Sequence, residues 1–248
     1  MPRQARKKSE SGIYHIMLRG INKQQIFEDD EDCQKYLQIL KECKAVSEFK
    51  LFAYCLMGNH IHLLIQLGKE PIDLIFKRIG SRYVYWYNLK YRRTGHLFQD
   101  RYKSEPVEAD SYFLTVVRYI HQNPVKAGMC ANISEYAFSS YHEYENDVNQ
   151  KLVNVDYALS LVSRTQLLEF FEETNNDICL EISDTIRLND EEAKEIIKSV
   201  SNCAHSTQVQ NLDINQRNNV IKILKENGLS IRQISRLTGI SFNIVRKY

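Results

Sequence analysis

The sequence predicts an α+β fold, in which a ferredoxin-like antiparallel sheet with helices is followed by an all-α region that ends in a helix-turn-helix. Two observations support this fold class. Over the first half of the chain, short segments with period-two alternation and longer segments with helical spacing follow the order β-α-β-β-α-β, which is the ferredoxin-like order. In the second half, only helical periodicity remains.

Local signals define the elements of the first half. The acidic run Asp29-Asp30-Glu31-Asp32 supplies a cap and a negatively charged first turn for a helix that should run to Ser47. Gly58-Asn59 predicts a tight turn between two strands. Pro124 is expected to stop the last helix, with a loose extension to Gly128, because proline lacks the N–H that continues a helix. The predicted strands are residues 12–20, 49–57, 60–67 and 97–107, and the predicted helices are residues 29–47, 71–91 and 110–123.

The second half predicts helices only. Residues 145–151 are typical of a linker, and residues 155–171 and 189–200 have helical periodicity among many acids. Helices over residues 216–227, 231–237 and 241–248, with a glycine-containing turn before the last, predict a helix-turn-helix, for which a plain three-helix packing module is the alternative. The expected division is residues 1–145 as the sheet domain, 146–210 as an acidic helical linker region and 211–248 as a DNA-binding segment.

Charge is distributed unevenly, although the net charge is only +2. Residues 74–104 contain eight basic residues and one acidic residue, residues 151–200 contain five basic and eleven acidic residues, and residues 201–248 contain seven basic and two acidic residues. Two basic segments separated by an acidic one favour two surfaces that contact a polyanion. A solvated helix face is the plain alternative for either segment.

Composition argues against several protein classes. No apolar run approaches the roughly 20 residues needed to span a bilayer. The basic N-terminus lacks the apolar stretch of a signal peptide, so no membrane partner is expected. The six cysteines are scattered without a C-x-x-C pair, which argues against a zinc knuckle and a disulfide framework and suits a reducing cytoplasm.

A candidate metal site begins in the stretch L-M-G-N-H-I-H-L-L-I, residues 56–65. Residues i and i+2 of a strand face the same side, so His60 and His62 point together. Two imidazoles on one face can bind a single divalent cation. A pair of core or surface histidines is the alternative for an isolated H-x-H.

The third helix offers a nucleophile and a further ligand. Tyr119 and Asn123 are four residues apart and therefore share a helix face. The phenol is a weak nucleophile at neutral pH because its pKa is about 10, and a divalent cation that polarises a phosphate would assist it. A one-residue error in helix phase would exchange the roles of Asn123 and Gln122. His121 should face a different side.

Four sequence blocks together resemble a known family. They are MGNHIHLL at residues 57–64, GSRYVYWYN at 80–88, RTGHLFQDRYK at 93–103 and RYIHQNPVKAG at 118–128. In this order and spacing they resemble the single-tyrosine transposases of the HUH endonuclease superfamily, with a nearer likeness to the REP-associated group. The resemblance covers about residues 12–144.

The resemblance implies a site and a reaction. It assigns His60, His62 and Asn123 as metal ligands and Tyr119 as the nucleophile. Members of the family cut single-stranded DNA, often beside a hairpin, with Mg²⁺ or Mn²⁺. They form a covalent 5′-phosphotyrosine and release a 3′-OH that can attack in strand transfer. The expected partners are thus single-stranded DNA beside a hairpin and, through the C-terminal segment, duplex DNA, in a cytoplasmic, nucleoid-associated protein. Monomer and homodimer both stay open.

Basic and aromatic residues near these blocks are candidates for DNA contact. Positive side chains can follow the phosphate backbone, and at most two of Tyr83, Tyr85, Trp86 and Tyr87 are expected to stack on unpaired bases. The expected nucleic-acid-binding residues are Arg78, Arg82, Arg92, Arg93, His96, Arg101 and Lys103, with Arg232, Arg236 and Arg246 in the C-terminal segment.

Two other functions fit the same residues. A non-catalytic DNA- or RNA-binding regulator would keep the fold without turnover, and a metal-dependent hydrolase would use water where Tyr119 stands. A covalent protein–DNA adduct that depends on Mg²⁺ or Mn²⁺ and on Tyr119 distinguishes the three.

Overall fold

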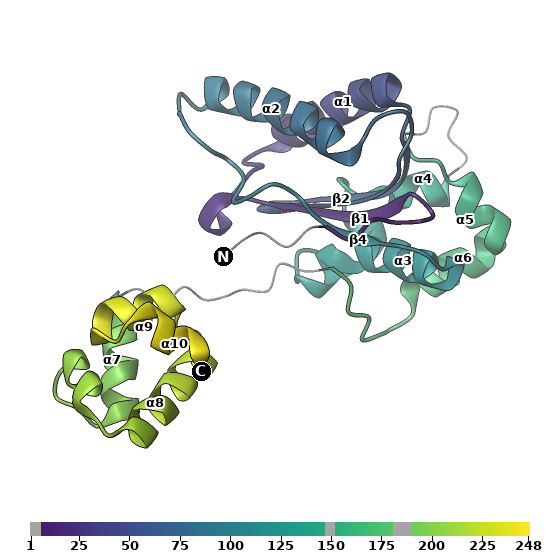
Figure 1. The fold of residues 1–248 in the computed structure, drawn as a ribbon. Coiled ribbons are helices and arrows are strands. Elements are labelled where there is room, and N and C mark those ends of the chain that lie inside the picture. Colours follow the sequence, from purple (N-terminus) through teal and green to yellow (C-terminus); the bar gives the residue numbers. More distant parts are fainter. Residues whose placement is uncertain (1–5, 147–151, 181–189) are drawn as a thin grey trace. The chain divides into compact units, whose positions relative to one another are not determined.

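A four-stranded antiparallel sheet forms the centre of the N-terminal part in the computed structural model, which describes residues 6–146, 152–180 and 190–248 (Figure 1). The strand order is β2-β3-β1-β4. Each neighbouring pair is antiparallel, which confirms the predicted α+β class. The strands are β1 Ile13–Arg19, β2 Lys50–Met57, β3 His60–Gln66 and β4 Lys103–Pro106.

The last strand is shorter than predicted. Residues 97–99 follow the end of β1, since the Gln99 N–H donates to the Arg19 carbonyl at 2.9 Å. At Asp100 the chain bends, and the Asp100 carboxylate accepts the N–H of Arg101 at 2.8 Å. An aspartate that binds a neighbouring backbone N–H competes with strand pairing, so only Lys103–Pro106 continues the ladder.

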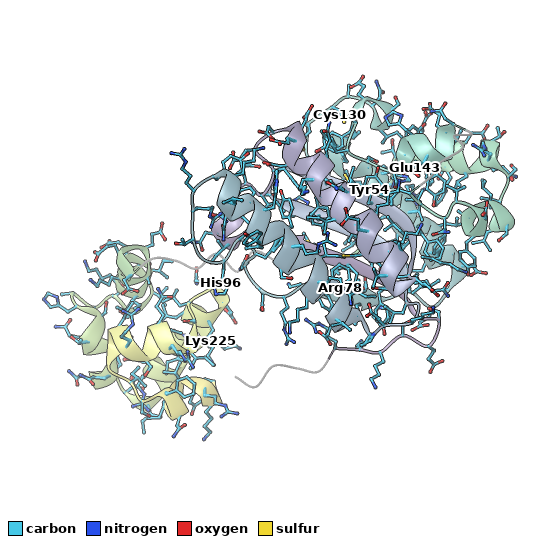
Figure 2. All side chains as sticks on the ribbon, turned by 90° about the horizontal axis from the view of Figure 1, so that it is seen from above. Tyr54, Arg78, His96, Cys130, Glu143 and Lys225 are labelled. Carbon is cyan, nitrogen blue, oxygen red and sulfur yellow. The ribbon has the colours of Figure 1, made fainter. Side chains whose placement is uncertain are left out.

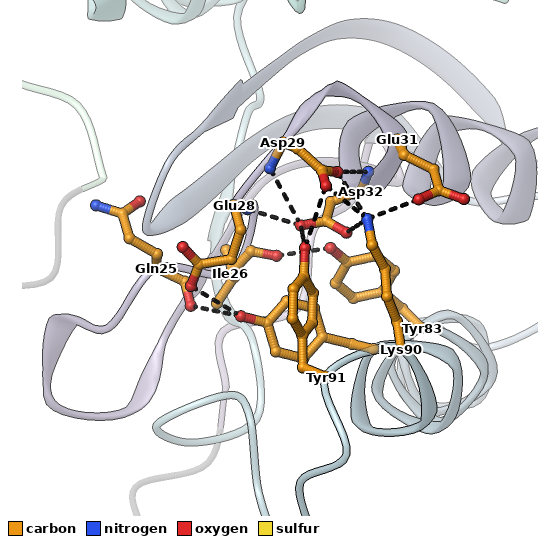
Figure 3. A network of polar contacts seen from close by, with 10 residues as sticks. Gln25, Ile26, Glu28, Asp29, Glu31, Asp32, Tyr83, Lys90 and Tyr91 are labelled. Carbon is orange, nitrogen blue, oxygen red and sulfur yellow. Dashed lines mark hydrogen bonds and ion pairs between the residues drawn. The ribbon is translucent and has the colours of Figure 1, made fainter.

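Helices cover both faces of the sheet. Helices α1, Asp30–Ser47, and α2, Ile72–Lys90, lie together on one face, and α3, Asp110–Lys126, lies on the other (Figure 1). As predicted, α1 begins with a capping box between Asp29 and Asp32. Figure 3 shows how Lys90, at the end of α2, donates to both of these carboxylates at 2.7–2.8 Å. This network joins the start of α1 to the end of α2.

Pro124 does not stop α3 as predicted, because regular helix continues to Lys126 with the proline inside its last turn. This continuation lies within the loose extension to Gly128 that the sequence predicts. A proline there removes one hydrogen bond close to the helix end. Gly128, which has a φ of 69°, follows the helix and turns the chain. The Met129 N–H donates to the Pro124 carbonyl at 2.9 Å, the bond that defines a Schellman motif.

Three short helices after α3 share the core of the sheet unit. They are α4 Tyr141–Glu145, α5 Asp156–Leu161 and α6 Arg164–Glu172. The chain before α4 covers the edge of β2, where the Leu56 N–H donates to the Phe138 carbonyl at 2.9 Å. Ala158 and Phe171 are fully buried in the same core as the sheet.

The chain divides into two compact units, Met1–Ile182 and Ser183–Tyr248. The predicted acidic region, residues 146–210, is therefore shared between the two units. Most of the predicted linker at 145–151 lies outside the described residues. In the described part of the chain, no helix is both long and apolar enough to span a membrane.

The C-terminal unit contains helices that agree closely with the predicted ones. They are α7 Asp190–Ser201, α8 Ile214–Glu226, α9 Ile231–Thr238 and α10 Phe242–Lys247. Ser230 caps α9 by accepting the Gln233 N–H at 3.2 Å, and Gly239, with a φ of 78°, turns the chain toward α10. A small apolar core that includes Ile221, Ile234 and Val245 holds the helices together.

Candidate active site

The structure brings the H-x-H pair against the helix predicted to supply the nucleophile. His60 and His62 begin β3, and their ring centroids are 5.1 Å apart. The His62 ring meets the ring of Tyr119 on α3 edge to face, with centroids 5.7 Å apart. A strand that points alternate residues to one side thus presents both imidazoles to the face of the sheet that α3 covers.

Each of the two histidines has a partner for one ring nitrogen. The Nδ1–H of His60 donates to the Asn59 side-chain oxygen at 2.7 Å. Nδ1 of His62 is hydrogen-bonded to Nε2 of His15 on β1, with the nitrogens 3.0 Å apart. These contacts use Nδ1 of each ring, and a ligating histidine normally binds the metal with one nitrogen and a neighbouring group with the other. Nε2 is therefore the candidate ligand atom of each histidine.

Burial keeps the imidazoles of His62 and His15 neutral. His62 is 1% exposed, and desolvation, followed by the neighbouring His15 and His60, holds its pKa well below the usual 6.5. Desolvation likewise lowers the pKa of His15 to about 3. Neutral imidazole is the form that binds metal, so His62 need not lose a proton at neutral pH before it can ligate.

The Tyr119 ring packs against two histidine rings and one lysine. The side chain is only 2% exposed, and its ring also meets the His15 ring, with centroids 5.9 Å apart. Nζ of Lys126, two turns further along α3, is 5.2 Å from the Tyr119 ring centroid. A cation at this distance is attracted to the ring face, so Lys126 adds positive charge next to Tyr119.

Asn123 and the two residues before it on α3 have different surroundings. The Asn123 amide nitrogen donates to the Tyr119 carbonyl at 2.9 Å, which leaves its side-chain oxygen as the possible ligand atom. The Gln122 amide instead donates to the carbonyls of Phe171 and Glu173 at 2.7 and 3.0 Å. His121 is fully buried on a different side. These contacts favour Asn123 over Gln122 as a third ligand.

The donor set fits a divalent cation with open coordination positions. Among the described residues, no group of three or more His, Cys, Asp or Glu side chains could hold a metal ion. A site built on His60 and His62 would therefore need an oxygen of another kind, such as the Asn123 amide. Two imidazoles and one amide oxygen leave positions for phosphate oxygens in the coordination shells of Mg²⁺ and Mn²⁺.

Several of the predicted DNA-contacting residues bind acidic residues of the protein. The Arg78 guanidinium donates to the Glu70 carboxylate at 2.6 and 2.8 Å, within the α1–α2 layer seen from above in Figure 2. Arg82 pairs with Glu42. Arg101 lies 3.8 Å from Asp73. The positive charge of residues 74–104 is thus partly neutralised inside the unit.

Other basic residues of this segment stay available to a ligand. Arg92, His96 and Lys103 are exposed, and Arg93 is half-buried over the Tyr87 ring. In the described ranges, no carboxylate lies within ion-pair distance of these four side chains. Figure 2 labels His96 in the loop after α2. Of the four aromatic residues considered for stacking, Tyr83 and Tyr87 are buried, Trp86 is partly buried and Tyr85 is 73% exposed.

The C-terminal arginines also differ from one another. Arg236 makes a two-pronged ion pair with Asp190 at the start of α7, and its NH2 is 2.7 Å from Oδ1. Arg232 and Arg246 are exposed, and no described carboxylate pairs with them. Arg236 thus helps to hold α9 against α7, whereas the other two can contact a ligand.

Sequence reasoning missed two residues on β1. His15 is bonded to His62, and Arg19 is the direct cross-strand partner of His60. Directly opposed residues of an antiparallel pair point to the same face, so Arg19 adds a cation beside the histidines. The period-two pattern of residues 13–19 placed His15 and Arg19 on one side of the strand, but only the register shows which residues they meet.

Comparisons with known proteins find similarity to transposases. Residues 8–123 match the family model described as "Transposase IS200 like". A REP-associated tyrosine transposase of Haemophilus influenzae is 27% identical over 122 residues, which cover 44% of this chain and 67% of that protein. The REP-associated tyrosine transposase of Escherichia coli is 25% identical over 112 residues, covering 44% of this chain and 63% of its own length.

A solved structure shares the fold. The structure of a REP-associated tyrosine transposase bound to a REP hairpin superposes with a TM-score of 0.52 at 18% sequence identity, covering 58% of this chain and 86% of that one. The family match contains the H-x-H pair, Tyr119 and Asn123. Within its N-terminal unit, the chain is therefore similar to the IS200-like transposase family over residues 8–123.

Proposed function

We propose that this transposase-family protein cleaves single-stranded DNA through a covalent bond between Tyr119 and a 5′-phosphate, assisted by a divalent cation at His60, His62 and Asn123. One observation carries the proposal: the buried Tyr119 ring lies edge to face with the His62 ring at 5.7 Å, although 57 residues separate them in the chain. A core tyrosine would pack equally well against apolar side chains.

The chemistry balances within the substrate and the enzyme. The Tyr119 oxygen attacks phosphorus, so an O–P bond forms as the bond from phosphorus to the 3′-oxygen breaks. The phenol gives up its proton, and the departing 3′-oxygen takes up one to become a 3′-OH. The new phosphodiester keeps the bond energy of the old one, so a later attack by a 3′-OH can complete strand transfer without a nucleotide cofactor.

A bound Mg²⁺ or Mn²⁺ would supply charge stabilisation at the scissile phosphate. The chain's own residues determine where that charge acts. Asn59 and His15 orient the two imidazoles, and the Tyr119 carbonyl orients the Asn123 amide. Lys126 adds positive charge beside the nucleophile.

Single-stranded DNA beside a hairpin is the proposed substrate. Lys103 on β4 pairs with Met17, which pairs with His62 on β3. The three residues form one row across the sheet and point to the same face, so Lys103 could hold the backbone next to the scissile phosphate. Arg92, Arg93 and His96 lie in a surface loop and are the next candidates for strand contacts.

The C-terminal unit is proposed to bind duplex DNA through a helix-turn-helix formed by α9 and α10. Exposed Arg232 and Arg246 would contact phosphates, and α10 would enter the major groove. The sheet unit is proposed to be ferredoxin-like, because its strand order β2-β3-β1-β4 and the placement of α1 and α2 on one face agree with that plan.

A covalent-adduct assay tests the proposed reaction. Wild-type protein with a labelled single-stranded oligonucleotide and Mg²⁺ or Mn²⁺ should give a slower-migrating adduct on a denaturing gel. Tyr119→Phe should abolish it, and Tyr85→Phe, which changes an exposed tyrosine, should leave it intact. Cleavage without any adduct would support a hydrolase, and binding without cleavage would support a non-catalytic regulator.

The division of labour between the units has its own test. Removing residues 183–248 preserves the core residues of the sheet unit, whereas a cut at residue 151 would remove buried Ala158 and Phe171. The truncated protein should still form the adduct with an excess of oligonucleotide, and should bind a hairpin with flanking duplex more weakly. Equal loss of both activities contradicts a separate role for the C-terminal unit.

A further inference from the structure

A buried polar row lies behind the histidine pair. His15 is fully buried on β1, between His62 on β3 and Glu105 on β4. Its Nε2 is 3.0 Å from Nδ1 of His62, and its Nδ1 is 4.0 Å from a Glu105 carboxylate oxygen. The same carboxylate oxygen accepts a hydrogen bond from the Tyr112 hydroxyl at 2.8 Å.

The hydrogen bond between the two imidazoles requires one proton. If Nδ1 of His62 carries it, Nε2 of His15 accepts, and Nε2 of His62 keeps a lone pair for a cation. If His15 donates instead, His62 carries its proton on Nε2 and cannot ligate through that atom. The tautomer of His62 thus depends on the tautomer of His15.

Glu105 favours the first arrangement. When Nε2 of His15 accepts, its Nδ1 must carry a proton, and that N–H faces the Glu105 carboxylate. In the described part of the protein, Nδ1 of His15 has no hydrogen-bond partner. Burying such a group without a partner costs free energy. A carboxylate 4.0 Å away stabilises an N–H there and not a lone pair.

We infer that His15 is a positioning residue, which accepts the Nδ1–H of His62 and so holds Nε2 of His62 ready to bind the cation, with Glu105 orienting His15. The inference deepens the proposed function and rests on it, because it assumes a cation at His60 and His62. The row also fixes the plane of the His62 ring relative to Tyr119, since the His15 ring contacts both rings at centroid distances of 5.2 and 5.9 Å.

If His15 only filled space in the core, position 15 would not require a histidine. Position 15 lies between buried apolar residues of β1, and an apolar side chain of similar size would fill it without desolvating two ring nitrogens. His121 provides the matched comparison, because it is equally buried, bonds to the Ser140 hydroxyl at 2.8 Å and lies away from His62.

The first measurement is cation affinity in the full-length protein, with Mn²⁺ as the probe and free Mn²⁺ followed by electron paramagnetic resonance. His15→Leu removes the acceptor and should weaken Mn²⁺ binding by about 10- to 100-fold, the usual effect of losing a partner of a metal-ligating histidine. His15→Gln puts an amide oxygen close to the position of Nε2 and should recover most of the affinity. His121→Leu should bind Mn²⁺ like the wild type.

The second measurement needs neither cation nor DNA. In metal-free protein labelled with ¹⁵N-histidine, the His62 ring shifts should report a proton on Nδ1, with the signal assigned by its loss in His62→Gln. His15→Leu should move that proton partly to Nε2, and Glu105→Gln should do so to a smaller extent.

Three results would overturn the inference. They are wild-type Mn²⁺ affinity in His15→Leu, equal loss in His15→Leu and His15→Gln, or an Nε2 proton on His62 in the wild-type protein. Failure of the proposed function looks different, because a wild-type protein that forms no adduct and binds no Mn²⁺ could still show the Nδ1 proton on His62 and its loss in His15→Leu.

Discussion

Helix α3 has two faces with different roles, although the residues on the two faces are neighbours in the sequence. Tyr119 and Asn123 form the site face, on which the Tyr119 ring meets the His62 ring and the Asn123 amide donates to the Tyr119 carbonyl. Arg118, His121 and Gln122, the anchor face, bind the chain that follows α3. The site face carries the proposed nucleophile and ligand, whereas each of the three anchor-face side chains is hydrogen-bonded to another part of the protein.

The difference shows that the role of an α3 residue depends more on its direction around the helix axis than on its position in the sequence. Residues one apart in a helix point in directions about 100° apart, whereas residues four apart lie almost in line. Tyr119 and Asn123 therefore lie on one side of α3, whereas the Gln122 amide donates to the carbonyls of Phe171 and Glu173. Variants on the two faces should separate loss of ligand binding from loss of stability.

Acid should lower the stability of the protein through buried histidines on both sides of the comparison, and this is the largest expected effect. Burial lowers the pKa of His15 and His121 to about 3 and holds that of His62 well below 6.5. Their unfolded forms take up protons first, so stability is full above pH 6.5 and is lost as the pH falls toward 3. The slope should approach about 1.4 kcal/mol per pH unit for each histidine, measured by urea unfolding of metal-free protein.

In this experiment, His121→Leu separates the contribution of the anchor face to the pH slope from that of the site face. It should remove about one third of the slope between pH 6.5 and 5, while the two histidines behind the site face keep the rest. Glu70, whose pKa is lowered to about 2 by Arg78 and Ser47, affects stability only below pH 4.5. An unfolding free energy that stays constant from pH 7 to 5 would contradict neutral buried histidines.

The adjacent pair Asn123 and Gln122 should respond in opposite ways. Asn123→Ala should weaken Mn²⁺ binding by about tenfold or more with little change in stability, because a ligand is lost from a half-buried position. Gln122→Ala should leave the affinity unchanged and lower the free energy of unfolding by about 2 kcal/mol, since buried backbone carbonyls lose their donor. The reverse pattern would make Gln122 the ligand.

Arg118 tests the anchor face alone. Its side chain is 8% exposed and pairs with Asp177 at 2.8 Å and Glu173 at 2.9 Å. Arg118→Met keeps the packing on Phe170 and should cost about 2 kcal/mol of unfolding free energy, since both carboxylates are partly solvated. Adduct formation at saturating oligonucleotide should persist at low temperature. Its loss in a folded variant would show that the anchor face also controls the site.

In the C-terminal unit, the comparison of exposed Arg246 with ion-paired Arg236 should give the smallest effects. Arg246→Ala should reduce the salt dependence of duplex binding by about one released ion, with unchanged melting. Arg236→Ala should slightly lower the melting temperature, because it removes the ion pair with Asp190. Binding titrations at several salt concentrations, together with thermal melting of each variant, check both expectations. A larger binding loss in Arg236→Ala would instead assign that residue to the DNA surface.

The sequence by itself determined the parts of the site that lie within one element. Period-two spacing put His60 and His62 on one side of a strand, and helical spacing put Tyr119 and Asn123 on one side of a helix. The cap at Asp29 marked a helix start that the structure confirms. These features depend on neighbours a few residues apart, so local periodicity is enough to find them.

Only the tertiary structure decided which of these groups meet. The partnership of His15 with His62 depends on the register between β1 and β3, and residues 152–179 join the core of the sheet unit through contacts made far along the chain. The positive segment 74–104 lost part of its charge to Glu70, Glu42 and Asp73 for the same reason. Strand order and register are long-range properties, because they depend on how whole surfaces pack together.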